Sequence, residues 1–232
     1  MLSIVVPAYN ESGYLASTLD DLHRGMADRH LEYEIVVVEN GSLDDTRAVA
    51  ARLAQCSRVV RTLSLTRPDY GAALRAGILE ARGEIVVCFD TDHYDLEFLG
   101  AALRALEGRN RADLVVGSKR AAASIDARPW PRRLVTATFA VVLRLGFGLG
   151  LSDTHGMKAM RRAAVIDLVL ECEFDGDLFD TELVIRASRA RKRVIELPVV
   201  VTERRPPRTS VWSRVPRTLV GLVRLRLALG RS

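Results

Sequence analysis

Residues 4–11 read Ile-Val-Val-Pro-Ala-Tyr-Asn-Glu, a short buried-strand pattern that ends at a proline and runs directly into polar side chains. Similar apolar runs recur at residues 35–38, 59–65, 85–89 and 114–116, and a later run at residues 194–201 predicts one further strand. Stretches with apolar residues at helical spacing separate most of these runs. This alternation predicts an α/β fold with a mostly parallel central sheet and helices on both faces. Ligands are expected at the carboxyl ends of its strands.

The size and charge of the chain limit the classes of function. Its 232 residues are enough to bury a core without disulfides or a structural metal. The net charge of +5 favours an anionic partner. Much of the positive charge lies at the end of the chain, where residues 204–232 hold eight arginines and no Asp or Glu. No zinc-ligand spacing, RNP-like aromatic strand or recognition helix is present, so nucleic acid is not the expected partner.

The cysteines and the apolar segments indicate in which cellular compartment the protein is expected. Cys56, Cys88 and Cys172 are far apart in the sequence, which predicts reduced, buried thiols in a cytoplasmic protein. The chain opens on a strand pattern without a secretory signal, and no segment reaches the length of a clean transmembrane helix. Residues 211–229 alternate apolar side chains with arginines, which predicts an amphipathic helix. Such a helix fits peripheral attachment to the inner face of the cell membrane, packing on the domain itself, or contact with a second subunit in a homodimer.

Polar side chains follow three of the predicted strands. Tyr9 and Glu11 follow the first, and the aromatic ring and nearby amide there suit a nucleobase. Glu39 ends the second strand and is followed by Asn-Gly-Ser, which suits a ribose or base contact. The segment Phe-Asp-Thr-Asp at residues 89–92 ends the fourth. Because parallel strands end at one edge of a sheet, these three segments are expected to converge.

Asp90 and Asp92 form the most informative pair. Two carboxylates separated by one residue at a strand end can both face Mg²⁺ or Mn²⁺, which prefer oxygen ligands. Such a cation would neutralise the departing diphosphate of a nucleotide. Acidic residues also end strands for turn chemistry alone, so the pair gains meaning from the other two strand ends beside it.

Several longer motifs carry a family resemblance. Val-Val-Pro-Ala-Tyr-Asn-Glu at 5–11, Val-Glu-Asn-Gly-Ser at 38–42, Gly-Ala-Ala-Leu-Arg-Ala-Gly at 71–77 and Ala-Arg-Gly-Glu-Ile at 81–85 precede the Phe-Asp-Thr-Asp segment. Together they resemble family 2 glycosyltransferases of the GT-A fold. Downstream motifs at 117–120, 153–158 and 196–199 resemble the polyprenyl-phosphate branch, which includes dolichyl-phosphate mannosyltransferase-like enzymes.

The resemblance implies a Rossmann-like GT-A domain over residues 1–210. Residues 1–118 would form its nucleotide-binding half and residues 119–210 its acceptor half, followed by a basic amphipathic helix at 211–232. It also implies an inverting, Mg²⁺- or Mn²⁺-dependent transfer from a GDP- or UDP-sugar. Polyprenyl phosphate at a membrane surface is the favoured acceptor.

The predicted site residues fall into four roles. Those expected to bind the nucleotide sugar are Pro7, Ala8, Tyr9, Glu11, Glu39, Gly71, Asp90, Thr91 and Lys119. The expected metal ligands are Asp90, Asp92 and His155, because neutral imidazole is a good ligand; a loop histidine bonded to the backbone fits His155 equally. The expected contacts to the acceptor or to phosphate are Arg120, Lys158, Arg204 and Arg205. The predicted catalytic residues are Asp90, Asp92 and Glu182, of which Glu182, or Asp180 near it, would take a proton from an acceptor hydroxyl.

Two departures from the family pattern leave alternatives open. Glu39-Asn40 stands where the family usually has two aspartates, and the motif at 153–156 is one residue shorter and lacks a common glutamine. The altered Glu39-Asn40 pair favours a catalytically silent nucleotide-sugar-binding protein as one alternative. The lack of a transmembrane helix keeps a glycosyltransferase with a soluble alcohol acceptor open, and a nucleotidyltransferase can share a similar sheet and metal site. A Rossmann dehydrogenase is disfavoured, since no GxGxxG follows the first strand.

Overall fold

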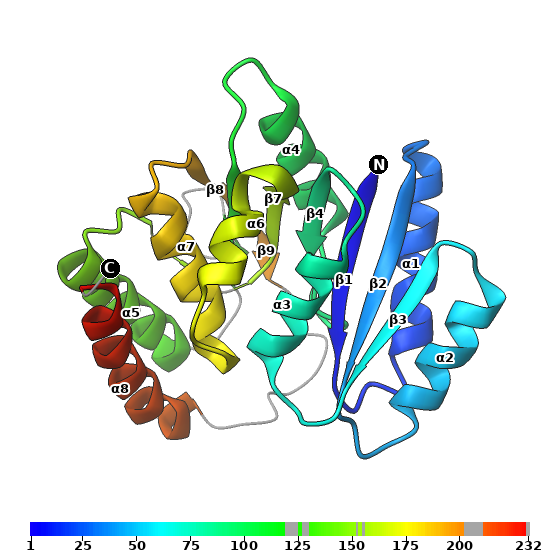
Figure 1. The fold of residues 1–232 in the computed structure, drawn as a ribbon, viewed down its shortest axis with the longest axis horizontal. Coiled ribbons are helices and arrows are strands. Elements are labelled where there is room, and N and C mark those ends of the chain that lie inside the picture. The colour runs from blue at the N-terminus through cyan, green and yellow to red at the C-terminus, as the bar shows by residue number, and fades with distance from the viewer. Residues whose placement is uncertain (119–124, 127–129, 152, 155, 202–210, 231–232) are drawn as a thin grey trace.

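The computed structural model describes residues 1–118, 125–126, 130–151, 153–154, 156–201 and 211–230 of the chain (Figure 1). Its strands are β1 Leu2–Ala8, β2 Tyr33–Asn40, β3 Val60–Leu65, β4 Ile85–Cys88, β5 Leu114–Ser118, β6 Ile125–Asp126, β7 Lys158–Arg161, β8 Val194–Pro198 and β9 Val200–Val201. Its helices are α1 Leu15–Asp28, α2 Thr46–Cys56, α3 Tyr70–Glu80, α4 Leu96–Glu107, α5 Trp130–Phe147, α6 Arg162–Glu171, the 3₁₀ helix η1 Gly176–Leu178, α7 Phe179–Arg189 and α8 Val211–Leu229.

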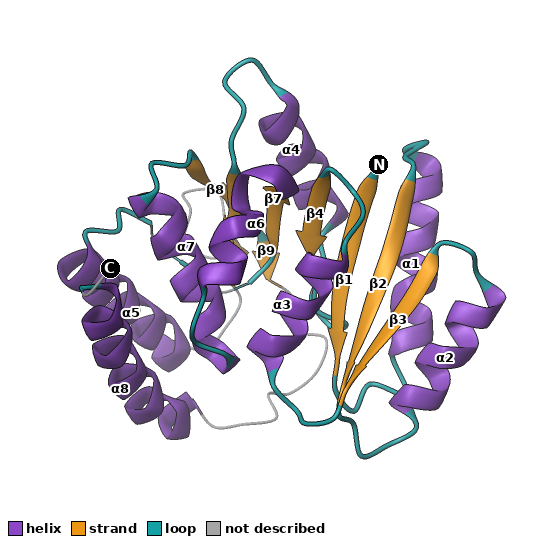
Figure 2. Cartoon of the chain, in the orientation of Figure 1, coloured by secondary structure: helices purple, strands orange, loops and turns teal. Residues whose placement is uncertain are grey.

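One seven-stranded sheet forms the centre of the molecule, in the order β3-β2-β1-β4-β7-β5-β8 (Figure 2). The pairs β3-β2, β2-β1, β1-β4 and β5-β8 are parallel, whereas β7 is antiparallel to both of its neighbours. Because β7 runs the opposite way, its first residue, Lys158, lies beside Cys88 at the end of β4. The amino end of β7 therefore joins the carboxyl ends of the other strands at one rim of the sheet.

Alternating side chains of the central strands enter two separate hydrophobic clusters. Val5 packs on one face with residues of α3, α6, α7 and α8, while Ile4 and Val6 pack on the other with residues of α1, α2 and α4. This period of two is what a strand covered by helices on both faces requires. Figure 1 shows the two helical layers on either side of the sheet.

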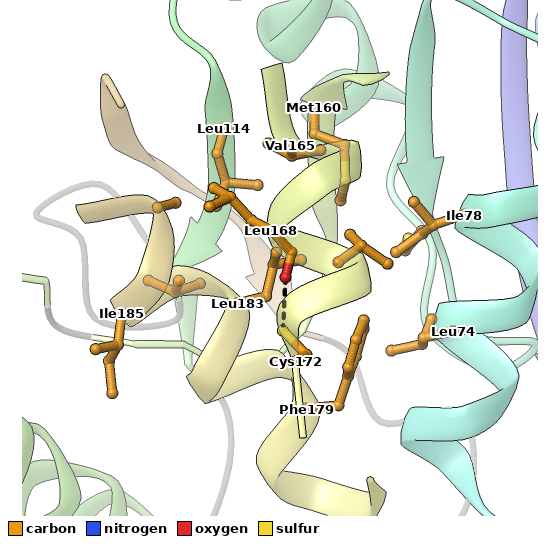
Figure 3. Close-up of a cluster of buried hydrophobic side chains, with 14 of the residues drawn as sticks. Leu74, Ile78, Leu114, Met160, Val165, Leu168, Cys172, Phe179, Leu183 and Ile185 are labelled. Atoms are coloured by element: carbon orange, nitrogen blue, oxygen red, sulfur yellow. Dashed lines mark hydrogen bonds between the residues drawn. The ribbon is translucent and has the colours of Figure 1, made fainter. Parts of the chain in front are cut away.

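The first of these clusters packs three helices closely together (Figure 3). Leu74 and Ile78 of α3 lie opposite Phe179 of α7, with Leu168 of α6 between the helices. The thiol of Cys172, just after α6, donates to the Leu168 carbonyl oxygen at 3.2 Å. Burial raises the pKa of the Cys172 thiol to about 12, so the thiol stays neutral.

Helices α5 and α8 lie side by side at the edge of the molecule beyond α7 (Figure 1). Leu143 of α5 and Leu222, Leu225 and Leu229 of α8 are buried in the same hydrophobic cluster as α7. The helix expected at the end of the chain therefore packs on the domain. Among the described residues, no helix combines the length and hydrophobicity needed to cross a bilayer.

Three sequence expectations need correction. The antiparallel β7 lies inside a motif that showed no strand pattern, and its four residues interrupt an otherwise parallel sheet. The run at 194–201, predicted as one strand, is divided between two sheets, because β9 pairs with β6 and not with β5. Cys56, predicted to be buried, is exposed at the last position of α2, whereas Cys88 and Cys172 are buried as predicted.

Candidate active site

The candidate site lies at the rim where β1, β2 and β4 end and β7 begins. Asp90 and Asp92 follow β4 in a tight turn, which reciprocal backbone hydrogen bonds between Asp90 and His93 close at 3.2 and 3.3 Å. The buried Thr91 anchors this turn, because its carbonyl oxygen accepts a hydrogen bond from the Thr18 hydroxyl of α1 at 2.7 Å. The two carboxylates are thus held on a short, fixed loop.

Tyr70, the first residue of α3, contacts this turn directly. Its hydroxyl donates to Asp90 Oδ1 at 3.0 Å. Burial, together with the nearby carboxylates of Asp90 and Asp180, raises the pKa of Tyr70 well above its usual value. The hydroxyl therefore stays protonated at neutral pH and donates to Asp90, which orients that carboxylate.

The loops after β1 and β2 are joined to each other. The amide of Asn10 donates to the Ser42 hydroxyl at 3.1 Å, and Asn10 Oδ1 accepts from the amide of Leu43 at 2.8 Å. Glu11, which is buried, donates its amide to Thr46 Oγ1 at 2.7 Å. The convergence of the first two loops predicted from the sequence is therefore present.

Glu39 closes the second of these loops. Its buried carboxylate accepts from the Ser42 amide at 2.5 Å and from Arg47 Nε at 2.9 Å. Burial opposes ionisation, but these hydrogen bonds and the charge of Arg47 hold the pKa of Glu39 below its usual value. The Glu39 side chain therefore stabilises this turn, and a contact to a ribose would be a second role.

Lys158 and Asp180 form a buried ion pair next to the Asp90 turn. Lys158 Nζ lies 2.8 Å from Asp180 Oδ1 and donates to the Gly156 carbonyl oxygen at 3.0 Å. Both side chains are almost fully buried. Lys158 was predicted to contact the acceptor or a phosphate, and in the structure its ammonium group lies between these two partners.

A second contact joins the same two segments. The Thr154 hydroxyl lies 2.9 Å from the hydroxyl of Thr181, and both residues are buried. The motif at 153–158 and the first turn of α7 were predicted as separate parts of the site. In the structure they form one unit beneath the rim.

Glu182 is fully buried in the first turn of α7. Its carboxylate accepts from the amides of Glu173 and Phe174 at 2.8–3.1 Å and from Arg186 Nε at 2.8 Å. This differs from the predicted proton acceptor, because a base must reach the acceptor hydroxyl and these contacts hold the carboxylate against the preceding loop. The same contacts indicate a structural role for Glu182.

Pro7, Ala8 and Gly71 are also occupied by packing. Pro7 and Ala8 are the last two residues of β1, and both are buried. A Cβ on Gly71 would lie 2.6 Å from the Gly176 nitrogen and 2.7 Å from Phe179 Cβ. Glycine at this position allows α3 to approach η1 and α7. Tyr9, by contrast, is half-buried at the rim itself.

Five predicted site residues lie outside the described part of the chain: Lys119, Arg120, His155, Arg204 and Arg205. Within the described part, no cluster of three or more His, Cys, Asp or Glu side chains is arranged to hold a metal ion. Asp90 and Asp92 still fit a hard divalent cation, since Mg²⁺ is commonly held by one or two carboxylates while phosphates and water complete its shell.

Sequence reasoning missed Tyr70 and the pairing of Lys158 with Asp180. Tyr70 follows the third strand, and the rule that ligands bind at strand carboxyl ends would have included its loop. The Lys158–Asp180 pair had no such signal, because it depends on an antiparallel strand that the sequence pattern did not reveal.

Comparison with known proteins identifies relatives over almost the whole chain. The family model described as Glycosyl transferase family 2 matches residues 3–169. An uncharacterised glycosyltransferase of Mycobacterium tuberculosis is 33% identical over 223 residues, which cover 96% of this chain and 93% of that protein. The human dolichyl-phosphate beta-glucosyltransferase is 31% identical over 218 residues, which cover 87% of this chain and 67% of that enzyme.

Solved structures share the fold. Glucosyl-3-phosphoglycerate synthase from Mycobacterium tuberculosis, in complex with Mn²⁺, UDP and phosphoglyceric acid, superimposes with a TM-score of 0.70. The match covers 97% of this chain and 78% of that chain at 22% identity. The same synthase was also crystallised with Mg²⁺ and UDP, again with a TM-score of 0.70.

Proposed function

The chain belongs to glycosyl transferase family 2, and from that premise we propose that it moves a sugar from a nucleoside diphosphate donor to a polyprenyl phosphate, using Mg²⁺ or Mn²⁺. Family membership and the named relatives make the protein a glycosyltransferase. This conclusion replaces the nucleotidyltransferase alternative. The donor, the cation and the acceptor are the proposed parts.

The observation that carries the proposed donor site is the Asp90 and Asp92 turn at the end of β4. Asp90 receives a hydrogen bond from Tyr70, which orients its carboxylate on this turn. A cation bound there would neutralise the charge that develops on the departing diphosphate. The synthase of similar fold was crystallised with Mn²⁺ or Mg²⁺ and UDP, which agrees with such a role.

The remaining rim residues would hold the nucleoside. Tyr9 is half-buried beside the braced loops of Asn10 and Glu39, where it offers an aromatic face to a base. The backbone of Pro7 and Ala8 would lie beside the bound nucleoside. Lys119, Arg120, Arg204 and Arg205 are proposed to contact phosphates, because guanidinium and ammonium groups pair with phosphate oxygens.

The contacts of α7 favour a phosphate acceptor over an alcohol. An alcohol acceptor needs a base to take its proton, whereas a phosphate monoester is already ionised at neutral pH. Glu182 is held by two amides and Arg186, and Asp180 is paired with Lys158. An acceptor that needs no base from α7 is therefore the better fit. The human relative is named for a dolichyl phosphate, which is consistent with this choice.

A lipid-linked acceptor implies work at a membrane surface, and we propose the cytoplasmic face. The inverting course predicted for the family requires the acceptor oxygen to approach opposite the diphosphate. In this arrangement the chain's own residues bind the donor, orient Asp90 and keep Asp180 paired. They do not need to move a proton to or from the acceptor.

A donor and acceptor panel tests the proposal. The purified protein would be incubated with UDP- and GDP-hexoses and Mn²⁺ or Mg²⁺, with either a polyprenyl phosphate or a soluble alcohol such as a phosphoglycerate. Nucleoside diphosphate release and mass spectrometry of the acceptor would measure transfer. We expect a glycosylated polyprenyl phosphate, and loss of at least about a hundredfold in rate with Asp92→Asn, since a single group that stabilises developing charge contributes that much.

Four results would contradict the proposal in different ways. Transfer only to the soluble alcohol would keep the donor site and reject the lipid acceptor. No binding or turnover of any donor, with either cation, would reject the donor site, whereas donor binding without turnover would favour a silent binding protein. Undiminished activity of Asp92→Asn would reject the assignment of the metal to this turn.

A further inference from the structure

Exposed hydrophobic side chains gather on the two outer helices. Of the ten large hydrophobic residues recorded as exposed in the described part of the chain, six lie on α5 or α8. They form what we call the outer face: Val141, Leu145, Leu219, Val220, Val223 and Leu227. Single exposed apolar residues are normal on protein surfaces, but a group on two adjacent helices marks a contact surface.

The outer face of α8 is separate from the face that packs on the domain. Leu222, Leu225 and Leu229 are buried, whereas Val223 and Leu227 are 61% and 62% exposed. At 3.6 residues per turn, the buried and the exposed sets lie on opposite sides of the helix. A helix that is apolar on both sides is usually covered on both. The outer side of α8 therefore has the composition of a surface that meets an apolar medium.

Positive charge borders this apolar strip. Arg224 and Arg226 are exposed and, by helical periodicity, lie on either side of the strip formed by Val223 and Leu227. On α5, the exposed Arg144 adjoins Leu145, which is 83% exposed. Neither helix contains an Asp or Glu. Arginine beside apolar side chains suits a lipid interface, where the stem lies along the acyl region and the guanidinium meets phosphate.

We propose that the outer face docks on an anionic phospholipid bilayer, with α5 and α8 lying along the headgroup region. The charge pattern favours lipid over a second copy of the chain. A symmetric pairing of two outer faces would bring Arg144, Arg224 and Arg226 of both copies together without an acidic residue on either helix to offset them. Anionic headgroups instead attract each arginine near the surface.

The outer face is linked to the acceptor side of the site. Helix α8 contacts η1, and Gly221 of α8 packs directly against Leu178. Leu178 is followed by Phe179 and by Asp180, the partner of Lys158. Docking through α8 would bring this end of α7 near the lipid surface. The inference rests on the proposed polyprenyl phosphate acceptor for its purpose, but lipid binding itself can be measured without any transfer reaction.

Vesicle flotation with the full chain tests the inference. We expect binding to vesicles of phosphatidylglycerol and phosphatidylcholine, weaker binding to phosphatidylcholine alone, and weakening by salt. The double variant Val223→Glu/Leu227→Glu should lower the partition coefficient by roughly tenfold or more, because two apolar side chains lose their burial in lipid. Leu43→Glu/Leu170→Glu is the matched control, since both leucines are exposed away from α5 and α8. It adds the same charge and should bind nearly as the wild type does.

A variant that removes only positive charge tests the role of the arginines, and light scattering tests whether the outer face forms a dimer instead. Arg224→Gln/Arg226→Gln should reduce binding to the anionic vesicles more than to the neutral ones, without adding any charge to the apolar strip. Equal binding by the wild type and both α8 variants, or equal loss in the Leu43/Leu170 control, would overturn the inference. So would a wild-type dimer in light scattering that Val223→Glu/Leu227→Glu converts to a monomer with unchanged vesicle binding.

The reaction itself separates this inference from the proposed function. Transfer to a short, water-soluble polyprenyl phosphate should survive in Val223→Glu/Leu227→Glu, while transfer to a long acceptor embedded in vesicles should fall with the binding. If the wild type binds vesicles but glycosylates neither acceptor, the proposed function fails and the docking surface stands. If it glycosylates the short acceptor but never binds vesicles, the docking surface fails alone.

Discussion

Tyr70 orients a proposed metal ligand from the next loop of the sheet. Its hydroxyl donates to Asp90 Oδ1 at 3.0 Å, and its raised pKa keeps that proton in place. Partners that orient metal ligands typically contribute 10- to 100-fold to metal affinity. We therefore predict that Tyr70→Phe weakens Mn²⁺ binding about tenfold or more in the presence of a nucleoside diphosphate. Titration calorimetry would measure this directly, without any turnover.

Tyr33→Phe is the matched control for that experiment. Tyr33 begins β2 at the opposite end of the sheet, where its hydroxyl contacts His23. It should leave Mn²⁺ affinity unchanged. Equal affinity in the wild type and Tyr70→Phe would show that the hydroxyl does not hold Asp90 for a cation.

The Lys158–Asp180 pair makes a prediction about stability. Removing one member of a buried ion pair leaves the other charge without compensation, which costs about 3–5 kcal/mol. Lys158→Met should therefore lower the free energy of unfolding by roughly that amount. The double variant Lys158→Met/Asp180→Leu should recover part of the loss, because it removes both buried charges. Urea unfolding of the wild type, Lys158→Met, Asp180→Leu and the double variant would complete a double-mutant cycle. If the loss in the double variant equalled the sum of the two single losses, the pairing would be contradicted.

Asp90 and Asp92 could be chosen as candidate metal ligands from the sequence, because two carboxylates at a strand end form a pattern that is local in sequence. Tyr70 is 20 residues from Asp90, and Lys158 is 22 residues from Asp180, so neither contact can be found by short spacing. The burial of Glu182 could not be predicted either, since it depends on amides of the loop before α7. Local chemistry was visible in the sequence, whereas partners contributed by distant segments were not.

Helix α3 depends on a glycine for its approach to η1 and α7. A Cβ on Gly71 would meet backbone atoms of Gly176 and the Cβ of Phe179 at 2.6–2.7 Å, and backbone cannot shift at low cost. We predict that Gly71→Ala destabilises the protein by about 1–3 kcal/mol, the usual cost of overpacking. Thermal and urea unfolding would measure the change.

Gly100→Ala is a control for which the opposite change in stability is expected. Gly100 lies inside α4, where a new Cβ would have only the end of the Arg104 side chain at 3.5 Å. Alanine is favoured over glycine in a helix interior by roughly 0.5–1 kcal/mol. Gly100→Ala should thus stabilise the protein slightly. If both substitutions stabilised it, the close approach of α3 to η1 would be in doubt.

The predicted GT-A fold is confirmed, and the strands with continuous apolar runs were placed correctly. Valine and isoleucine runs such as that of β2 identify strands buried on both faces. Strand β7 lacked this signal, because its four residues begin and end with the basic side chains Lys158 and Arg161. Burial of Lys158 beside Asp180 makes that strand compatible with the sheet interior, and this depends on tertiary structure.

Across the whole sheet, the carboxylates at its two edges have different roles. The carboxyl rim carries Asp90 and Asp180 near the candidate site, whereas the opposite edge carries Glu34 at the start of β2. Glu34 accepts from the Ser3 hydroxyl of β1 at 2.7 Å, Arg61 Nε of β3 at 2.8 Å and the Arg82 amide at 2.7 Å. The Glu34 carboxylate thus joins β1, β2 and β3 far from the candidate site. Its contribution is therefore to stability and not to the proposed catalysis.

The protonation of Glu34 therefore predicts how stability depends on pH. Burial opposes ionisation, but Arg61, Ser3 and Arg82 together lower the pKa of Glu34 below its ordinary value of 4.5. A lowered folded-state pKa gives stability that is complete above about pH 4.5 and is lost as the pH falls through the folded-state pKa. Glu34→Gln should lower the free energy of unfolding at pH 7 by about 1.5–3 kcal/mol, the range for hydrogen bonds to a charged group.

The size of that loss should itself change with pH. Urea unfolding between pH 7 and pH 3 should show the wild type and Glu34→Gln converging below about pH 4.5, because protonated Glu34 and glutamine are then alike in charge. Glu32→Gln is the matched control, since Glu32 is exposed and lies 3.9 Å from the amino terminus, and its curve should follow the wild type throughout. A gap between wild type and Glu34→Gln that stayed constant down to pH 3 would mean that the charge of Glu34 does not stabilise the three strands it joins.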